Sequence, residues 1–488
     1  MKLVYDIKDK PSFGKLIVFA FQQLLAILAA TIVVPVIVNA NVTDAIIKGE
    51  ITYQFANFEM QQSAALFGAG IGTLVYLLFT KFKSPVFLGS SFAFLGSMFA
   101  AFAGAVSAQA GYAGLIIGAA FAGLVYVIIA LVVKFAGVKW IDKLMPKQVI
   151  GPTVAIIGLT LASSAIGDLQ NGKYMIEKII PIMDKAGMPV IENGVAATTT
   201  TVVSTASPLI AVLCGIIALF VVMICSVYGK KTPKLIPFII GILAGYAVAA
   251  VFTVIGIKTG NTKLMLIDFE AFKDMQLFSV PDFTFLTAKD GLKEINGSYI
   301  ASVAMAYVPV AFVVFAEHIA DHKNVSSIIE KDLLDDPGLH RTLLGDGVGS
   351  MAGALFGGCP NTTYGESIAC VAITGNASVI TIFVTALICI AMSFFNPFVV
   401  FLSSIPNCVM GGVCMALYGF IAVSGLKMVQ KVDLEDNRNL FVVSVILIAG
   451  IGGLVLTFGK ITITDVATAL ILGIIANLIL GNKAKAAE

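Results

Sequence analysis

Isolated acidic residues are the side chains of this sequence that could do chemistry. Glu366 is the only charged residue between Asp346 and Lys427, and that interval is long enough for about three or four membrane crossings of roughly 20 residues each. A carboxylate at the centre of a bilayer costs roughly 3 kcal/mol or more. A chain that keeps such a group has a use for it, so Glu366 is a candidate binding residue.

A second acidic pair follows an uncharged stretch that runs from Gly297 to Ala316. Glu317 comes directly after this stretch. Asp321 lies four residues later, so both side chains share one face of a helix. The same segment could instead be a helix end whose charges meet lipid headgroups.

Carboxylates and broken helices together indicate a particular kind of ligand. Ionised carboxylates accept hydrogen bonds and suit a neutral molecule with several N–H donors. Glu366 follows the segment Asn361-Thr362-Thr363-Tyr364-Gly365, a poor interior for a transmembrane helix. Unwound backbone at such a break leaves amide N–H groups free to donate to ligand carbonyls. A small planar ring with alternating N–H and C=O groups, such as uracil, meets both demands, whereas an inorganic anion would be repelled.

The same acidic groups could carry a proton. Removal from water favours the neutral form of a carboxyl group, so buried carboxyls can exchange protons near neutral pH. Asp321 is one turn from Glu317 and can couple to it, with His322 next to it in the chain. Protonation changes the charge that crosses with a substrate, which is the physical basis of symport. A sodium ion could fill the same role.

Two histidines raise a metal site as an alternative. His318 and His322 are four residues apart beside Glu317 and Asp321, and all four are metal-ligand types. The third histidine, His340, lies in a charged loop, so no histidine-rich partner completes the site. We therefore expect no resident metal or cofactor and no metal-dependent enzyme.

The composition is that of a polytopic membrane protein. The 488 residues are 58% hydrophobic and 12% charged, against about 25% charged in soluble domains. The net charge of +2 gives no basis for nucleic-acid binding. Arg341 and Arg438 are the only arginines, so no arginine cluster exists to clamp a phosphate. The first apolar run is too long for a cleavable signal peptide.

Hydropathy predicts fourteen membrane spans. Their approximate limits are 16–39, 62–80, 86–106, 113–134, 147–166, 208–228, 235–257, 299–320, 343–358, 362–379, 380–397, 399–422, 439–457 and 464–481.

Lysines gather in alternate loops between these spans. This pattern follows the positive-inside rule if both termini are cytoplasmic, and it requires an even number of spans. The opposite connections, near 107–112, 359–361 and 398, carry almost no lysine. The lysines on the predicted cytoplasmic side are Lys81, Lys83, Lys134, Lys139, Lys143, Lys147, Lys230, Lys231, Lys234, Lys427, Lys431, Lys483 and Lys485.

The chain divides into two halves of seven spans. Residues 1–258 would form the first repeat, 259–298 an extracellular connection, and 299–488 the second repeat with a cytoplasmic tail. An odd number of spans per half makes the repeats inverted. Small polar residues at Gly89-Ser90-Ser91 interrupt the third span, and the break before Glu366 interrupts the tenth, the equivalent position. Paired interruptions point to a midplane binding site, although the first could be a tight helix-packing patch.

Several motifs at these positions resemble the uracil permeases of the nucleobase–ascorbate transporter (nucleobase:cation symporter) family. The resemblance covers nearly the whole chain. Its strongest motifs are QQLLAILAATIVVPV from Gln22, FLGSSFAF from Phe87, FAEHIADH from Phe315, KDLLDDPGLHR from Lys331 and PNTTYGESIACVAITG from Pro360. Purine transporters of the family typically have glutamine and asparagine where this chain has Glu366 and Ser367.

The resemblance implies an all-α polytopic membrane protein with about 14 transmembrane segments. Two inverted repeats would form a core and a gate domain, and short strands would interrupt spans 3 and 10. The implied ligand is uracil, held by Glu317 and Glu366. Backbone at Phe92 and Gly365 would contact the ring carbonyls.

The resemblance further implies pocket-lining positions at Ala30, Tyr364 and Tyr418, and the break adds Ser91. Family members are often homodimers whose core moves like an elevator. This chain departs from the family pattern at Ser367, where asparagine is usual, and at Ala369, where glycine is usual. Asp321 occupies a place where some uracil permeases have histidine, which leaves the proton carrier open among Asp321, Glu317 and His322.

We therefore expect a proton-coupled uracil importer in a bacterial cell membrane. A xanthine or other purine or pyrimidine substrate, or coupling to sodium, remains an alternative. An anion exchanger of related fold should lack the carboxylate at position 366. A membrane enzyme would need a metal or nucleophile cluster.

Overall fold

The computed structural model describes residues 3–482, except 54, 56–57, 138–139, 141–143, 182–190, 193–194, 197, 231, 274 and 459–460. Some lysines of the orientation prediction lie outside the described residues: Lys139, Lys143, Lys231, Lys483 and Lys485.

Helices occupy all fourteen predicted spans. Within the described residues, eight are long and apolar enough to cross a membrane. These are α1 (Phe13–Ile47), α2 (Gln62–Phe79), α4 (Ala108–Ala136), α6 with α7 (Lys147–Thr160 and Ala162–Asp168), α8 (Pro208–Tyr228), α10 (Pro237–Thr259), α12 (Gly297–Ile329) and α17 (Asn407–Val429). The other spans correspond to η2 with α3 (Phe92–Phe94 and Leu95–Ala103), α13 (Leu339–Gly357), α14 (Gly365–Thr374), α15 (Val379–Phe394), α18 (Asn437–Ile451) and α19 (Asp465–Asn482).

The twelfth span lies later in the chain than 399–422. A separate short helix, α16 (Asn396–Ser404), comes first, and α17 forms the crossing. Pro397 stands in the first turn of α16, and Pro406 is the N-cap of α17. Proline is favoured in the first turn of a helix, and the two prolines coincide with two helix starts within one apolar run. Residue 398 therefore lies inside a helix rather than in a connection.

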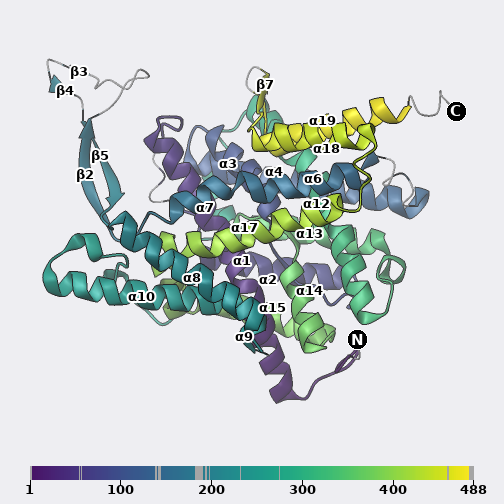
Figure 1. Ribbon diagram of the computed structural model, residues 1–488, viewed down its shortest axis with the longest axis horizontal. Helices are drawn as coiled ribbons and strands as arrows, with labels where there is room; N and C mark the ends of the chain where they lie inside the picture. The colour runs from purple at the N-terminus through teal and green to yellow at the C-terminus, as the bar shows by residue number, and fades with distance from the viewer. Residues whose placement is uncertain are drawn as a thin grey trace.

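The remaining elements lie between the crossings. They are β2 (Met175–Pro181), β3 (Ile191–Glu192), β4 (Val195–Ala196), β5 (Thr198–Ser204), α9 (Thr232–Leu235), η3 (Thr262–Leu264), η4 (Glu270–Phe272), α11 (Thr284–Gly291), η5 (Leu334–Gly338), β7 (Leu456–Phe458) and β8 (Ile461–Ile463). Strands β2 and β5 pair as an antiparallel arm that projects at the upper left of Figure 1.

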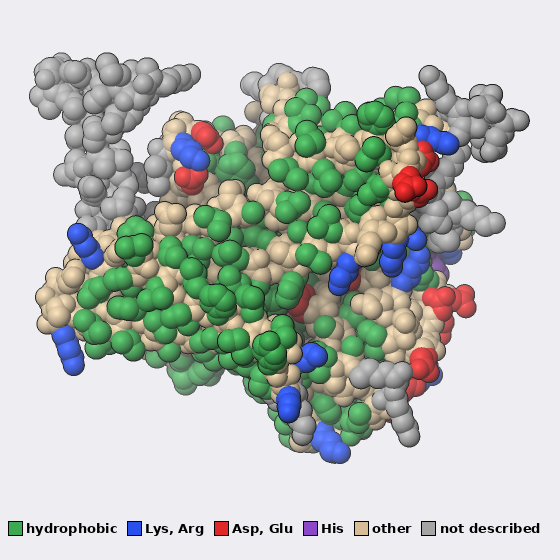
Figure 2. Space-filling view, in the orientation of Figure 1, with side chains coloured by type: hydrophobic (Ala, Val, Ile, Leu, Met, Phe, Trp, Pro, Cys, Tyr) green, Lys and Arg blue, Asp and Glu red, His purple; other side chains and the backbone are tan. Residues whose placement is uncertain are grey.

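The outer surface is apolar where lipid would cover it. Hydrophobic side chains cover most of the face in Figure 2 over α8 and α10, whereas charged side chains lie mainly around its margin. Large side chains such as Leu209 and Phe220 on α8 and Val251 on α10 are exposed. A large contiguous apolar surface of this kind marks a face that contacts lipid instead of water.

Two short strands join the halves of the chain. β1 (Leu88–Ser90) pairs antiparallel with β6 (Asn361–Thr363), and Gly89 lies opposite Thr362. Each strand leads into a helix, η2 with α3 after β1 and α14 after β6. Equivalent segments therefore meet in opposite directions, as inverted repeats require.

The helices pack into two groups that cut across the halves of the chain. Packing of α2 against α13 and α15, of α4 against α12 and α13, and of α1 against α15 defines one group, which we call the core. Packing of α17 against α6 and α8, of α10 against α8, and of α18 against α19 and α6 defines the other, which we call the gate. Each group takes helices from both repeats.

Glycines allow the closest helix contact in the core. A Cβ on Gly68 of α2 would lie 2.6 Å from the Gly353 carbonyl oxygen of α13, and one on Gly349 would lie 2.7 Å from the Gly72 oxygen. Small residues let transmembrane backbones approach where no hydrophobic effect drives association. This seam fixes α13 behind β6 and thus the position of the tenth span.

Candidate functional site

A cavity of about 430 Å³ lies between the core and the gate. Its size is within the usual range for small-molecule sites. Core residues that line it include Ala26, Phe92, Ala93, Glu317, Ala320, Asp321, Thr362, Thr363, Tyr364, Gly365, Glu366, Ala369, Cys370 and Ile373. Gate residues that line it include Val154, Ile157, Ser226, Lys234, Leu235, Phe238, Leu417, Phe420, Ile421, Ser424 and Met428.

Three carboxylates face this cavity. Glu317 and Asp321 come from α12, and Glu366 comes from the first turn of α14. All three residues are half-buried. The Thr363 hydroxyl of β6 donates to Asp321 Oδ2 at 2.6 Å, which ties α12 to the strand pair. The remaining carboxylate oxygens can accept hydrogen bonds from a ligand.

Two helix N-termini end at the same cavity. Neither Ser91, before η2, nor Tyr364, before α14, caps its helix with a side chain. The first-turn N–H groups of a helix have no partner within the helix, and Phe92 and Gly365 line the cavity. The strand pair holds both ends in register, because Ser91 N donates to Pro360 O at 2.9 Å and Tyr364 N to Phe87 O at 3.1 Å. The cavity therefore presents amide donors beside carboxylate acceptors.

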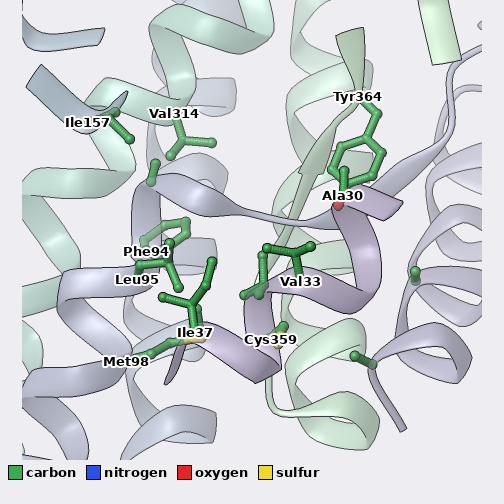
Figure 3. Close-up of a cluster of buried hydrophobic side chains, with 14 of the residues drawn as sticks. Ala30, Val33, Ile37, Phe94, Leu95, Met98, Ile157, Val314, Cys359 and Tyr364 are labelled. Atoms are coloured by element: carbon green, nitrogen blue, oxygen red, sulfur yellow. The ribbon is translucent and has the colours of Figure 1, made fainter. Parts of the chain in front are cut away.

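Tyr364 braces the strand pair from behind. Its hydroxyl donates to the Ser90 carbonyl oxygen at 2.8 Å. Its ring lies so close to Gly89 that a Cβ there would come within 2.8 Å of the tyrosine oxygen. Figure 3 shows Ala30 of α1 directly beside the tyrosine ring. Ala30 is buried and does not line the cavity; Ala26, about one turn earlier, does.

Ser367 connects three segments at the start of α14. Its hydroxyl oxygen accepts hydrogen bonds from the Gln23 side chain and, at 3.1 Å, from the Phe87 backbone N–H. Gln23 also donates to the Ser367 carbonyl oxygen at 3.3 Å. Serine in place of asparagine is therefore accommodated by a glutamine from α1.

Tyr418 of the gate supports the cavity wall from outside. Its ring packs edge-on against Phe92 with centroids 6.0 Å apart. Tyr418 itself is buried and does not line the cavity, whereas Leu417 and Ile421 on the same helix do.

A buried polar network lies behind the carboxylates. His318 Nδ1 is 2.7 Å from Asp346 Oδ2. His322 Nε2 is 2.6 Å from the Tyr76 hydroxyl, which donates to Ser84 Oγ at 2.7 Å. The rings of His318 and His322 stack with centroids 4.0 Å apart.

The sequence-predicted site residues therefore fall into two layers. Phe92, Glu317, Asp321, Tyr364, Gly365 and Glu366 line the cavity; Ala30, Ser91, His322 and Tyr418 lie behind its wall.

Sequence reasoning missed Thr363 and Asp346. In the sequence, Thr363 stands out only as part of the segment that interrupts the tenth span, although a threonine near acidic residues can donate a hydrogen bond to them. Asp346 served only as the boundary of an uncharged interval, yet it lies in α13, inside a predicted span.

The histidines do not join the acidic residues in a metal site. They bond to Asp346 and Tyr76 while Glu317 and Asp321 face the cavity. Among the residues that the structure describes, no group of three or more His, Cys, Asp or Glu side chains could hold a metal ion.

Known proteins resemble the chain along its length. A family model described as a permease family, for xanthine and uracil permeases, matches residues 14–223 and 180–458. The chain is 36% identical over 493 residues to a uracil permease of Bacillus caldolyticus, covering 100% of this chain and 97% of the relative. It is 34% identical to a uracil permease of Bacillus subtilis (strain 168), over 98% and 95% of the two chains. It is 30% identical to a uracil permease of Escherichia coli (strain K12), over 97% and 93%.

Two solved structures share the fold. The transmembrane domain of the cyanobacterial bicarbonate transporter BicA matches with a TM-score of 0.54 at 15% identity, over 94% of this chain and 96% of that one. The murine anion transporter Slc26a9 in its inward-facing state matches with a TM-score of 0.58 at 11% identity, over 98% and 69%. These likenesses confirm the predicted fold class, an all-helical membrane protein of two inverted seven-span repeats with core and gate.

Proposed function

The chain belongs to the xanthine/uracil permease family, and we propose that it is a secondary active transporter that imports uracil together with protons across the cell membrane. That it is a membrane transporter, and not an enzyme, follows from the family. Uracil as the substrate and the proton as the coupling ion are the proposal. The relatives named as uracil permeases, at 30% identity or more, support the choice of substrate.

The proposal rests on the match between the hydrogen-bonding groups of the cavity and those of the uracil ring. Glu317 and Glu366 offer acceptors, and the helix N-termini at Phe92 and Gly365 offer amide donors. Uracil carries two ring N–H groups and two carbonyl oxygens. The N–H groups and the carbonyl oxygens of uracil can therefore all find hydrogen-bond partners in the cavity. A polar ligand needs such partners when it is removed from water. Hydrogen bonds to ionised groups are about twice as strong as neutral ones, so the carboxylates would dominate affinity.

Ala30, Ser91, Tyr364 and Tyr418 act in this proposal as supports. They hold the strand pair and Phe92, and Tyr364 also presents an edge to the cavity. A xanthine or another base could enter the same cavity. An inorganic anion fits poorly, because three carboxylates face the space it would occupy.

The cavity would open to the cytoplasm in this conformation. Lys234 of α9 and Met428 of α17 line it, and both stand beside loops that the lysine pattern assigns to the cytoplasm. Farther along α1, Val36 and Ile37 line a second cavity of about 1060 Å³, while Ile27–Val34 between the two cavities is buried. With both termini cytoplasmic, this second cavity is the outer vestibule. A homodimer in the membrane, which the resemblance to the family implies, is part of the same proposal.

Uptake of labelled uracil into proteoliposomes tests the proposal. We expect uptake that an inward proton gradient drives and that unlabelled uracil suppresses more than xanthine or cytosine does. A sodium gradient in place of the proton gradient separates the two coupling ions. Absence of uracil uptake under either gradient would refute the proposed substrate.

A further inference from the structure

His318 and Asp346 form a closed pair one layer behind the cavity. His318 of α12 and Asp346 of α13 are exposed by only 0% and 1% of their side-chain areas, and Nδ1 and Oδ2 are 2.7 Å apart. Both helices belong to the core, so the pair would move with the carboxylates of the cavity. Its ring and carboxyl group are separate from Glu317 and Asp321, which face the cavity.

The neighbouring threonine links the protons of this pair to a hydroxyl that can turn. Thr342 Oγ1 lies 3.0 Å from Leu339 O, to which it can donate, and 3.0 Å from His318 Nε2. When the hydroxyl donates to Leu339 O, Nε2 carries a hydrogen and donates to Oγ1. In that arrangement Nδ1 shares one further proton with Asp346, because two lone pairs would otherwise face each other. That proton sits either on the imidazole as a cation or on the carboxyl group.

Release of this proton requires a definite rearrangement. The imidazole would have to become the Nδ1–H tautomer, and the Thr342 hydroxyl would have to turn from Leu339 O to Nε2. A buried carboxylate would then remain with less compensation, which is costly in a dry interior. The pair therefore has two discrete states that differ by one proton.

The charge of the pair would change the electrostatic potential at nearby acidic groups. Glu317 is within electrostatic range of Asp321, Glu366 and Asp346. Asp346 Oδ1 has no hydrogen-bond partner among the described residues, so its charge is incompletely screened. Among the described residues, His322 on α12 stacks on His318 and Tyr126 on α4 packs edge-on against it, while Tyr76 on α2 is hydrogen-bonded to His322.

We propose that the His318–Asp346 pair is a proton-binding site of the transport cycle, with Thr342 as its hydroxyl switch. This inference rests on the proposed proton-coupled uracil transport. Protonation of the pair lowers the negative charge around Glu317 and Glu366 without occupying the cavity. The substrate can thus keep its carboxylate partners while a proton travels with it.

The test separates exchange of uracil from uptake driven by a pH gradient. With one proton per uracil, a gradient of about one pH unit can drive up to about tenfold accumulation. We expect Asp346→Asn to exchange labelled for unlabelled uracil across proteoliposomes but to show no accumulation above equilibrium. A pH dye inside the vesicles should report protons entering with uracil in the wild type and none in the variant. Tyr126→Phe is the matched control, because the hydroxyl that it loses has no hydrogen-bond partner among the residues that the structure describes, while the ring keeps contact with His318; it should accumulate uracil as the wild type does.

Thr342 provides a second pair of variants, which leave both His318 and Asp346 in place. Thr342→Val removes the acceptor of Nε2–H and should lower accumulation toward that of Asp346→Asn, whereas Thr342→Ser keeps the hydroxyl and should restore it. If Asp346→Asn does not fold, this pair decides the matter in the same way.

Wild-type accumulation in Asp346→Asn would overturn the inference, as would wild-type accumulation in Thr342→Val. A wild type that takes up no uracil, or takes it up only with sodium, would instead overturn the proposed function on which the inference rests.

Discussion

Individual acidic side chains set the chemistry of the cavity. Glu317 and Glu366 can only accept hydrogen bonds when ionised, so in the proposed binding mode they would favour ligands with N–H donors. A site built to bind a donor rejects analogues that lack it, because its own polar group is left unpaired. Selectivity for a free pyrimidine base would then depend on the two ring N–H groups.

Methylated analogues probe this dependence. We expect 1,3-dimethyluracil, which has no N–H group, to compete with labelled uracil at least ~100-fold more weakly than uracil itself, from loss of two charge-assisted hydrogen bonds of about 1.5–3 kcal/mol each. Thymine, which adds a methyl group to carbon and keeps both N–H groups, is the control for added bulk. Equal competition by uracil and its dimethyl analogue would show that the carboxylates do not bind the ring nitrogens.

Ser367 is expected to matter for stability through two hydrogen bonds. Ser367→Ala leaves the Gln23 amide and the Phe87 N–H without this acceptor in a buried site, at a cost of about 1–3 kcal/mol. Thermal unfolding in detergent should therefore shift to lower temperature. Ser226→Ala, whose hydroxyl has no hydrogen-bond partner among the described residues, should unfold as the wild type does. An unchanged unfolding temperature for Ser367→Ala would remove the proposed link between α1 and α14.

The sequence predicted the exposed layer of the site better than the layer behind it. Glu317 and Glu366 could be found because a charge in an apolar run is conspicuous. Ala30 and Tyr418 were assigned to the lining through resemblance, but a shift of about one turn separates a lining residue from a supporting one, and hydropathy does not resolve that shift. The partners of Ser367 and His318 come from segments far away in the chain, so no local pattern could reveal them.

At the scale of elements, the β1–β6 pair positions both helix N-termini. The strand pair has little room for a larger side chain at Gly89, because the Tyr364 ring lies over that residue. The sequence indicated the interruption of both spans, since Gly-Ser-Ser and Asn-Thr-Thr are poor in helices. Hydropathy does not indicate α16, because that helix and α17 lie in one apolar run; the signal in the sequence is the pair Pro397 and Pro406, which mark the two helix starts.

Two glycine substitutions test the strand pair. Gly89→Ala should displace Tyr364 and break its bond to Ser90, with a loss of about 1–3 kcal/mol of stability from overpacking and weaker uracil binding. Gly96→Ala is the matched control in α3, where a Cβ would meet no described atom within 4 Å; it should stabilise the helix by up to ~1 kcal/mol. Thermal unfolding and uracil binding of the two variants provide the comparison. If Gly89→Ala behaves like Gly96→Ala, the ring of Tyr364 does not hold the strand pair.

At the scale of the whole molecule, the two cavities would form the two ends of the proposed transport path. They lie on opposite sides of the buried segment Ile27–Val34 of α1. Movement of the core against the gate would close one cavity and open the other around a fixed site. The repeat architecture supports this motion because both groups contain helices from both halves.

Side-specific labelling tests the direction of opening. In a background with Cys370→Ala and Cys225→Ser, Ile373→Cys in the inner cavity should react with a membrane-impermeant maleimide from the cytoplasmic side, and uracil should slow the reaction. Ser163→Cys, in the second cavity, should react from the opposite side. Reaction of Ile373→Cys from the outside alone would reverse the proposed orientation.

Equilibrium binding of labelled uracil to the purified protein tests the central claim most directly. We predict saturable binding to the wild type and to Glu435→Ala, which removes an exposed carboxylate that does not line the cavity. Glu366→Ala should bind at least ~10-fold more weakly, since it loses a charge-assisted hydrogen bond of about 1.5–3 kcal/mol. Undiminished binding of uracil by Glu366→Ala would contradict the account.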